Sequence, residues 1–207
     1  MNAALKTGNL LRRLRVPEGA TSDPEPRRFD LNALAGRLVE LSAGRSSATL
    51  TVALCLVRDA QKEGETAAWV TACETSFFPP DAAALGVDLD ALVIVQVPAP
   101  RDVARAADKL ARSGGFGMVV LDLGAWCNVP MPLLSRLTAL AQRHHTAVVC
   151  LTENAGSLGS LVSLRAEVWR RRMGGGRFAV RLEVVKDKQR GPGWRHVEVL
   201  DGPAGLR

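Results

Sequence analysis

Five almost wholly apolar segments, separated by amphipathic stretches, limit what this chain can fold into. The apolar segments lie at residues 37–41, 66–70, 91–97, 117–122 and 146–151, and helical patterns lie between them at residues 47–63, 79–85, 101–113 and 131–145. Continuous apolar runs are typical of strands that are buried on both faces of a parallel sheet. The alternation of strands and helices therefore predicts an α/β fold in which helices flank a mostly parallel sheet.

The C-terminal part of the chain follows a different pattern. Apolar and polar residues alternate at residues 162–169 and again at residues 178–185, and the segment 173–177, Met-Gly-Gly-Gly-Arg, separates the two runs. Alternation with a period of two on both sides of a glycine-rich turn predicts a β-hairpin. Residues 194–200 have the composition of a third antiparallel strand. We therefore expect a C-terminal antiparallel hairpin to extend the parallel sheet.

The first 30 residues differ from the rest. Leu5, Leu11 and Leu14 alternate with basic residues, which predicts a short amphipathic helix. Three prolines, at positions 17, 24 and 26, predict a linker after it. We expect residues 1–30 to form this N-terminal helix and linker, and residues 31–207 to form one domain, a length that supports a single core.

Composition indicates a soluble globular protein. Hydrophobic residues make up 47% of the chain and charged residues 23%. No apolar run approaches the roughly 18 residues that span a bilayer, and the N-terminus lacks the apolar core of a secretory signal. The four cysteines form no C-x-x-C pair, which favours reduced core cysteines over a zinc site. We therefore expect a cytoplasmic protein without a bound metal.

Positive charge is concentrated near the C-terminus. Residues 165–207 contain 11 Lys or Arg and 5 Asp or Glu, whereas residues 38–164 carry a net charge of −3. This asymmetry predicts an acidic partner surface or nucleic acid near the C-terminal end, although charges of this kind also keep sheet edges soluble. The candidate partner- or DNA-binding residues are Arg170, Arg171, Arg172, Lys186, Lys188 and Arg190.

From Arg37 onward the chain resembles the core of RecA. The resemblance is ungapped from Arg37 to Lys62 and continues, with small adjustments, through residues 66–70 and 85–90. It resumes at Val-Val-Leu-Asp, residues 119–122, and again at residues 184–188, so it covers most of residues 37–200. This resemblance implies a RecA-like core with a phosphate-binding loop after the first strand.

The loop that the resemblance aligns with the phosphate-binding motif G-x-x-x-x-G-K-[ST] has lost the motif residues. Its eight positions are Ala43, Gly44, Arg45, Ser46, Ser47, Ala48, Thr49 and Leu50. Ala43 and Ala48 replace the glycines, Thr49 replaces the lysine that reaches the phosphates, and Leu50 replaces the hydroxyl that holds Mg²⁺. We therefore expect no nucleotide cofactor and no catalysis. Asp122 and Glu74, near the family's metal-supporting and catalytic acids, are interpreted as structural remnants.

One branch of RecA relatives shares these departures. Residues 112–123, Arg-Ser-Gly-Gly-Phe-Gly-Met-Val-Val-Leu-Asp-Leu, resemble the ImuA proteins, and so do the altered loop and the arginines at 170–172. The resemblance implies a non-catalytic adaptor in SOS-induced translesion DNA synthesis and mutagenesis. The implied partners are an ImuB-type relative of Y-family polymerases, RecA, and an error-prone polymerase of the DnaE type, with DNA contacted weakly or indirectly.

Three other hypotheses remain open from the sequence. The chain also resembles SulA, a RecA-fold relative without a working phosphate-binding loop, which would make it an inhibitor of cell division. An atypical ATPase would need a replacement for the missing lysine. A DNA-binding RecA paralogue would use the basic C-terminal region, where Trp169 and Trp194 offer aromatic surfaces for bases.

Overall fold

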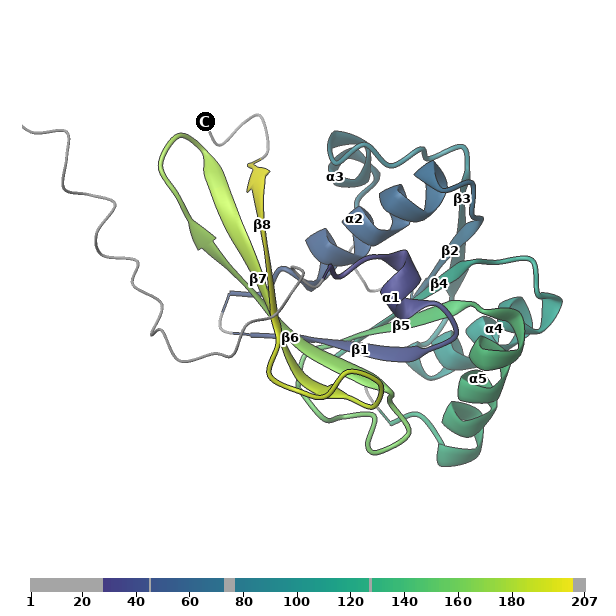
Figure 1. The fold of residues 1–207 in the computed structure, drawn as a ribbon. Helices are drawn as coiled ribbons and strands as arrows, with labels where there is room; N and C mark the ends of the chain where they lie inside the picture. The colour runs from purple at the N-terminus through teal and green to yellow at the C-terminus, as the bar shows by residue number, and fades with distance from the viewer. Residues whose placement is uncertain (1–27, 45, 73–76, 127, 203–207) are drawn as a thin grey trace, which may run out of the picture.

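The computed structural model describes residues 28–44, 46–72, 77–126 and 128–202. The predicted N-terminal helix, most of the predicted linker, Arg45 and Glu74 lie outside the described residues. Figure 1 shows a twisted central sheet with helices on both faces, and the last strands reach away from these helices. No helix among the described residues is long and apolar enough to cross a membrane.

One mixed sheet organises the described part of the chain. Its order is β3-β2-β4-β5-β1-β6-β7-β8. The strands from β3 to β6 pair in parallel, and β6, β7 and β8 pair antiparallel. The strands are β1 Leu38–Ala43, β2 Ala67–Ala72, β3 Leu92–Val97, β4 Met118–Gly124, β5 Ala147–Thr152, β6 Leu164–Arg172, β7 Arg177–Asp187 and β8 Arg195–Asp201.

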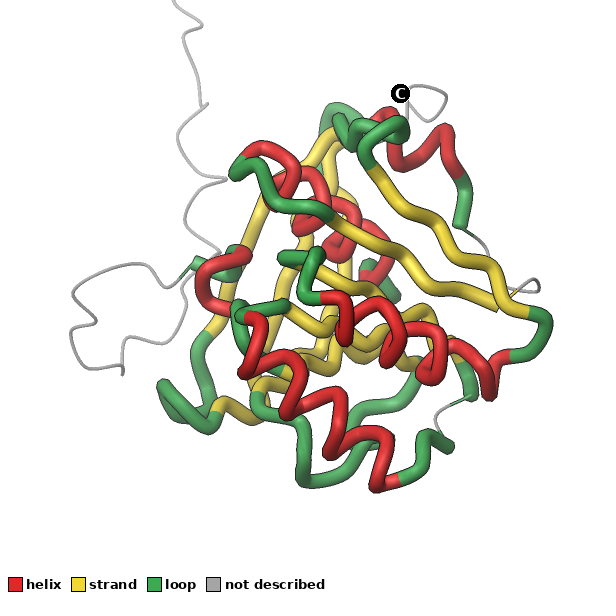
Figure 2. Tube along the Cα trace, turned by 90° about the vertical axis from the view of Figure 1, so that its right-hand side faces the viewer, coloured by secondary structure: helices red, strands yellow, loops and turns green. Residues whose placement is uncertain are grey.

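Helices cover both faces of the parallel strands. The helices are α1 Leu31–Leu34, α2 Thr49–Lys62, α3 Pro79–Ala84, α4 Pro100–Ser113 and α5 Met131–His144. The first three pack on one face, and α4 and α5 pack side by side on the other (Figure 2). Proline in the first turn of α4 and a left-handed Gly114 (φ 68°) after its end fit the usual signals for helix boundaries.

The core explains why the strand sequences are continuously apolar. Along β4, Met118 and Val120 enter the cluster beneath α2, whereas Val119 and Leu121 enter the cluster beneath α4 and α5. Both faces of a central strand are therefore buried, so every position favours an apolar side chain. The predicted fold class, a mostly parallel α/β sheet with an antiparallel C-terminal extension, is confirmed.

Two details differ from the expectation. Helix α1 was not expected, because four residues are too few to show a periodic pattern; Asp30 caps it by accepting a hydrogen bond from the Ala33 N–H at 3.0 Å. Strand β3 was expected to be buried on both faces, but it is the outermost strand of the sheet, and Val93 and Ile94 are 41% and 38% exposed. Local sequence cannot distinguish an apolar edge strand from a central one.

Candidate functional site

The loop after β1, at the position of the phosphate-binding loop, runs alongside β6. Parallel pairing extends to Ala43 and Val168 at the end of β1. Beyond it, the Gly44 N–H donates to the Val168 carbonyl at 2.9 Å, and the Arg170 N–H donates to the Ser46 carbonyl at 2.9 Å. The first part of the loop is therefore held by backbone hydrogen bonds as an extension of the sheet.

Trp169 lies against this loop and explains why position 44, which is not one of the motif glycines, is a glycine. A methyl group on Gly44 would lie 3.2 Å from the Trp169 Cβ and 3.2 Å from the Val168 carbonyl oxygen, which is closer than normal van der Waals contact. A phosphate-binding loop needs N–H groups that point into an anion site. Here the Gly44 N–H is committed to β6, so this glycine serves close packing of the loop against Trp169.

The second part of the loop leads into α2 without a charged side chain among its described residues. The Ser47 and Thr49 hydroxyl oxygens lie 3.1 Å apart, and Ala48 supplies no side-chain cap to the helix. Leu50, where the motif requires a hydroxyl for Mg²⁺, is 37% exposed. The helix terminus therefore offers backbone N–H groups but neither the lysine nor the hydroxyl ligand of the motif.

A cavity of about 620 Å³ lies between this loop and the ends of β4 and β5. Its described lining contains two acids, Asp122 and Glu153, and no Lys or Arg. Burial raises the pKa of the Asp122 carboxyl above its ordinary value, although hydrogen bonds from Thr71 and from the Gly124 backbone oppose the shift. Two acids without a described cation make this cavity electrostatically unfavourable for a polyphosphate. Among the described residues no group of three potential metal ligands occurs.

The predicted basic residues form two separate groups. Arg170 and Arg172 project from one face of β6 and Arg171 from the other, because side chains alternate along a strand. The guanidinium carbon of Arg170 lies 5.6 Å from the Phe178 ring centroid, an arrangement typical of a cation–π contact. These arginines lie near the turn between β6 and β7.

The other group lies at the opposite end of the hairpin. Lys186 Nζ donates to the Ser160 carbonyl at 2.9 Å, and Lys188 Nζ donates to the Leu161 carbonyl at 3.4 Å. Both lysines therefore bind the segment before β6. Arg190 follows β7, and its N–H donates to Asp187 at 3.2 Å. Lys186 lies seven residues along β7 from the partner of Arg171, which corresponds to about 24 Å at roughly 3.4 Å per residue. The structure therefore does not bring all six residues into one site.

Comparison with known proteins agrees with this architecture. A family model described as the RecA N-terminal domain matches residues 32–132. RecA of Corynebacterium urealyticum is 45% identical over 87 residues, which are 42% of this chain and 23% of that protein. RecA of Francisella tularensis subsp. novicida is 31% identical over 143 residues, 60% of this chain and 40% of that protein.

The chain has a RecA-like core and is similar to RecA over residues 32–132. It spans less than half the length of these two RecA relatives. The core has a strand, a loop and a helix, β1 to α2, at the position where RecA has its phosphate-binding loop. It also has Asp122 near the end of β4.

Two buried ion pairs that join the antiparallel strands to the RecA-like core were not expected from the sequence. An Arg37 Nη2 atom lies 2.6 Å from Asp187, which also accepts a hydrogen bond from Trp194 Nε1 at 3.2 Å. Arg165 Nε donates to Glu40 at 2.6 Å. The only sequence signal for these contacts was a charged residue, Glu40, inside an apolar strand.

Trp194, a candidate for stacking on bases, is buried in this structure. Its ring centroid lies 6.2 Å from that of Phe29, and its indole N–H is committed to Asp187. A base-stacking surface needs an accessible aromatic face. Trp194 therefore fixes the strand arrangement and offers no such face, whereas Trp169 remains half-buried beside Gly44.

Proposed function

We propose that this RecA-like protein is a non-catalytic adaptor in SOS-induced translesion DNA synthesis, which binds an ImuB-type polymerase relative and RecA, with a DnaE-type polymerase in the same assembly. The observation that carries the proposal is the loop after β1, because its backbone pairs with β6 and Trp169 covers it. A RecA-like core that lacks the lysine and the hydroxyl of the motif still has surfaces for other proteins, and a binding role needs only these surfaces.

An open edge of the sheet supports an adaptor role. Strand β3 ends the parallel side of the sheet, and its exposed Val93 and Ile94 lie on opposite faces of that edge. Exposed apolar edge strands are ready-made sites for pairing with another chain. We assign RecA to this edge, since it belongs to the part of the chain that matches the RecA family model.

The loop gives the first test. Isothermal titration of the full chain with Mg-ATP is expected to give no saturable heat at millimolar nucleotide, because the cavity has two acids and no described cation. RecA of Corynebacterium urealyticum, titrated under the same conditions, serves as the positive control. Saturable micromolar binding by this chain would contradict a nucleotide-independent role and favour an atypical ATPase.

Binding to the proposed partners gives the second test. We expect saturable binding to an ImuB-type protein and to RecA filaments by interferometry without added nucleotide. The variant Ile94→Lys places a charge on the β3 edge and is expected to weaken RecA binding at least tenfold. A matched variant, Val95→Lys in the same strand but on the half-buried side, reports whether the change merely disturbs the fold.

Two outcomes contradict the proposal. A folded chain that binds neither partner, and that causes filamentation when overexpressed, would favour the SulA-like alternative. Equal RecA affinity for the unmodified chain and for Ile94→Lys would move the RecA contact away from β3.

A further inference from the structure

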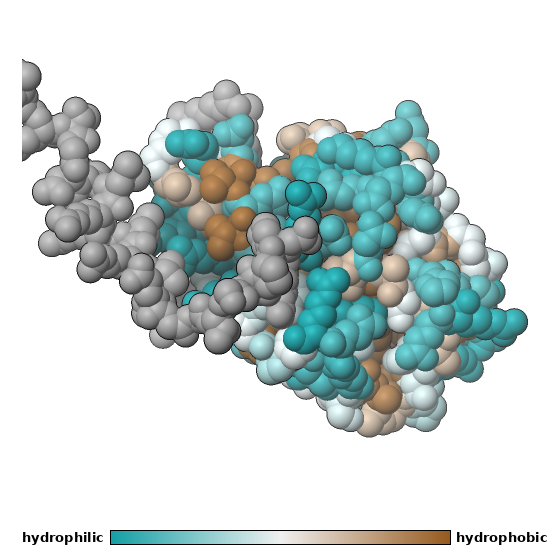
Figure 3. Space-filling model, in the orientation of Figure 1, coloured by the Kyte–Doolittle hydropathy of each residue, from teal (hydrophilic) through white to brown (hydrophobic). Residues whose placement is uncertain are grey.

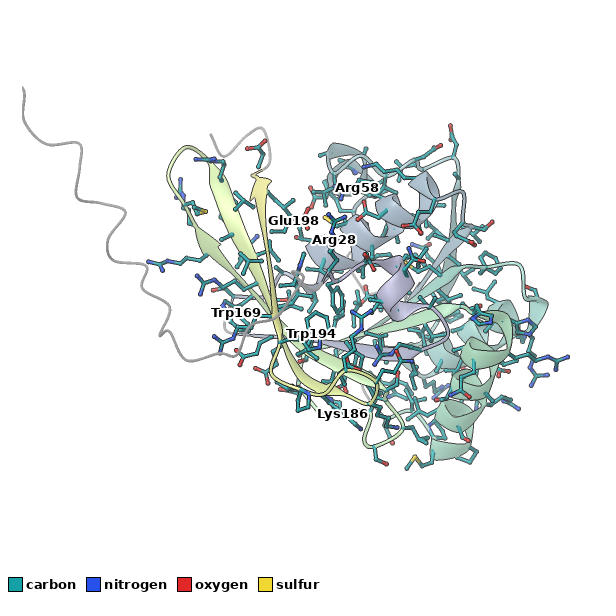
Figure 4. All side chains as sticks on the ribbon, viewed as in Figure 1. Arg28, Arg58, Trp169, Lys186, Trp194 and Glu198 are labelled. Atoms are coloured by element: carbon teal, nitrogen blue, oxygen red, sulfur yellow. The ribbon has the colours of Figure 1, made fainter. Side chains whose placement is uncertain are left out.

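The opposite edge of the sheet has features that the proposed function does not use. Strand β8 is the last strand in the sheet order and pairs only with β7. No hydrogen bond from a described residue reaches its outer edge. Edge strands in native proteins are usually blunted by lysine, proline or a bulge. The middle of β8, Val-Glu-Val at residues 197–199, contains no lysine, proline or bulge, and its one charged side chain, Glu198, points toward Arg58 of α2 (Figure 4).

The backbone of β8 presents donors and acceptors at this edge. The Val184 N–H donates to the Trp194 carbonyl, and the Gly202 N–H donates to the Gly176 carbonyl, so both residue pairs are of the hydrogen-bonded kind. In an antiparallel ladder such pairs alternate with pairs whose N–H and C=O groups point away from the partner strand. Val197 and Val199 fall at these intervening positions. Their N–H and C=O groups therefore point outward, toward the open edge.

The side chains beside this edge combine apolar and positive character. We define the hairpin outer face as six side chains on one face of the antiparallel strands: Trp169, Arg171, Ala179, Arg181, Val197 and Val199. The same face also carries Arg177 and the acids Glu167, Glu183 and Asp201, of which Glu183 pairs with Arg195. Val197 and Val199 are 54% and 48% exposed. Among the described residues no ion pair involves Arg171 or Arg181. Figure 3 shows apolar side chains over β8 surrounded by hydrophilic ones.

A cavity adjoins the same edge. It has a volume of about 450 Å³ and lies between β8, the end of α2 and the segment that begins at Arg28. His196 and Glu198 line it from β8, and Glu198 points toward Arg58 of α2 (Figure 4). The added strand would lie about 4.8 Å from β8. The cavity leaves space for side chains on the α2 side of such a strand. Its lining has four acids and two bases (Asp30, Asp59, Glu63 and Glu198; Arg28 and Lys62), so this side favours neutral or basic side chains, and the acidic ones belong on the opposite side.

From these observations we infer that β8 accepts an extended acidic segment of a partner protein as an added strand. The inference rests on the proposed adaptor function. The segment's backbone pairs with Val197 and Val199, and its apolar side chains lie against these valines on the outer face. Its carboxylates lie near Arg181 and Arg171, which form no ion pair with a described residue. Main-chain pairing gives the affinity in this mode of recognition, and alternate side chains give the specificity.

A nucleic acid fits this surface less well than an acidic strand. Single-strand binders present successive aromatic platforms along a basic groove. Here Trp169 is the aromatic member of the outer face, and its ring already lies against Gly44. The free edge amides and the two exposed valines also have no role in phosphate binding. A protein segment is therefore the occupant that fits this edge, and titration with a single-stranded oligonucleotide distinguishes it from nucleic acid.

The test compares variants of the full chain for binding to the ImuB-type protein by interferometry. Val199→Pro removes one outward N–H without touching a hydrogen bond to β7, and proline is tolerated on edge strands in this orientation. We expect at least a tenfold loss of affinity. Val199→Ala keeps the N–H and trims the side chain, so it is expected to lose less. Circular dichroism and RecA binding, expected to be unchanged, show that each variant is folded.

A second variant keeps the test independent of proline. Arg171→Glu combined with Arg181→Glu reverses the charge of the outer face and is expected to weaken binding at least tenfold at low salt. The loss is expected to shrink as salt screens the charges. Equal affinity of the unmodified chain, Val199→Pro and the double variant would overturn the β8 assignment while the proposed function stands. Absence of binding by the unmodified chain to both proteins would overturn the function as well.

A separate titration tests the nucleic-acid alternative. A fluorescent single-stranded oligonucleotide is titrated into the unmodified chain and the double variant. The expected result is weak binding that the two substitutions leave unchanged. Strong, salt-sensitive binding that the double variant abolishes, together with unchanged affinity for the ImuB-type protein, would overturn the proposal and identify the outer face as a nucleic-acid site.

Discussion

Replacing Asp187 with asparagine is expected to lower the free energy of unfolding by about 3–5 kcal/mol. The Arg37 guanidinium, 2.6 Å from Asp187, is almost fully buried, and the Asp187 side chain is fully buried. The substitution removes the negative charge while Arg37 stays buried without its counter-ion. Trp194 Nε1 also loses a charged acceptor. Urea unfolding followed by circular dichroism at pH 7 measures the loss.

The pH dependence of this loss has a definite sign. Burial alone would raise the pKa of Asp187, but hydrogen bonds from the Gln189 N–H, from Arg37 and from the Arg190 N–H outweigh it and hold the pKa below its ordinary 3.8. A carboxyl whose pKa is lowered on folding stabilises the protein above its unfolded pKa, and this contribution is lost as the pH falls through the folded pKa. The stability difference between the unmodified chain and Asp187→Asn is therefore expected to be constant at neutral pH and to shrink below about pH 4.

An exposed ion pair in the same hairpin provides the control. Arg195 and Glu183 lie 3.2 Å apart, with 64% and 36% of their side chains exposed. Glu183→Gln is expected to change stability by about 0–1 kcal/mol, because solvent screens exposed pairs. If Asp187→Asn were as mild as Glu183→Gln, the Arg37–Asp187 contact would not hold β7 to the core.

Replacing Arg165 with methionine is the second change expected to have a large effect, again about 3–5 kcal/mol of unfolding free energy. Arg165 Nε donates to Glu40 at 2.6 Å, and Thr152 donates to the same carboxylate at 3.3 Å. Glu40 is completely buried in β1, so methionine removes its ion-pair partner in the centre of the sheet and leaves only the Thr152 hydrogen bond and the more distant charge of Lys186. Urea unfolding at pH 7 measures this effect also.

The matched control for this change is Arg177→Met. Arg177 begins β7, is exposed, and takes part in no ion pair among the described residues. Surface substitutions of this kind usually change stability by about 0.5 kcal/mol or less. A loss at Arg165 no larger than that at Arg177 would mean that Glu40 finds compensation elsewhere. A large loss of stability in Arg165→Met but not in Arg177→Met would show that the Arg165–Glu40 contact holds the antiparallel strands to the parallel core.

The sequence predicted the order and type of the main elements. Apolar runs such as 91–97 and 117–122, the amphipathic helix patterns and the glycine-rich turn at 173–177 are local signals, and strands and helices formed where these signals lie. The loss of the lysine and the hydroxyl from the loop was also visible in the sequence, because motif positions lie next to one another. Patterns of this kind depend only on residues that are close in sequence, so they can be recognised before the fold is known.

The structure alone decided which strands lie at the edges and what the altered loop does. Val93 in β3 and Val199 in β8 look like buried residues in the sequence, yet both are exposed because they lie in edge strands, where fewer side chains cover the faces of the sheet. Gly44 meets Trp169, and Arg37 meets Asp187, only because β6 and β7 return to the first strand from far along the chain. Such contacts depend on strand order, which arises from packing the whole sheet, so no local stretch of sequence encodes them.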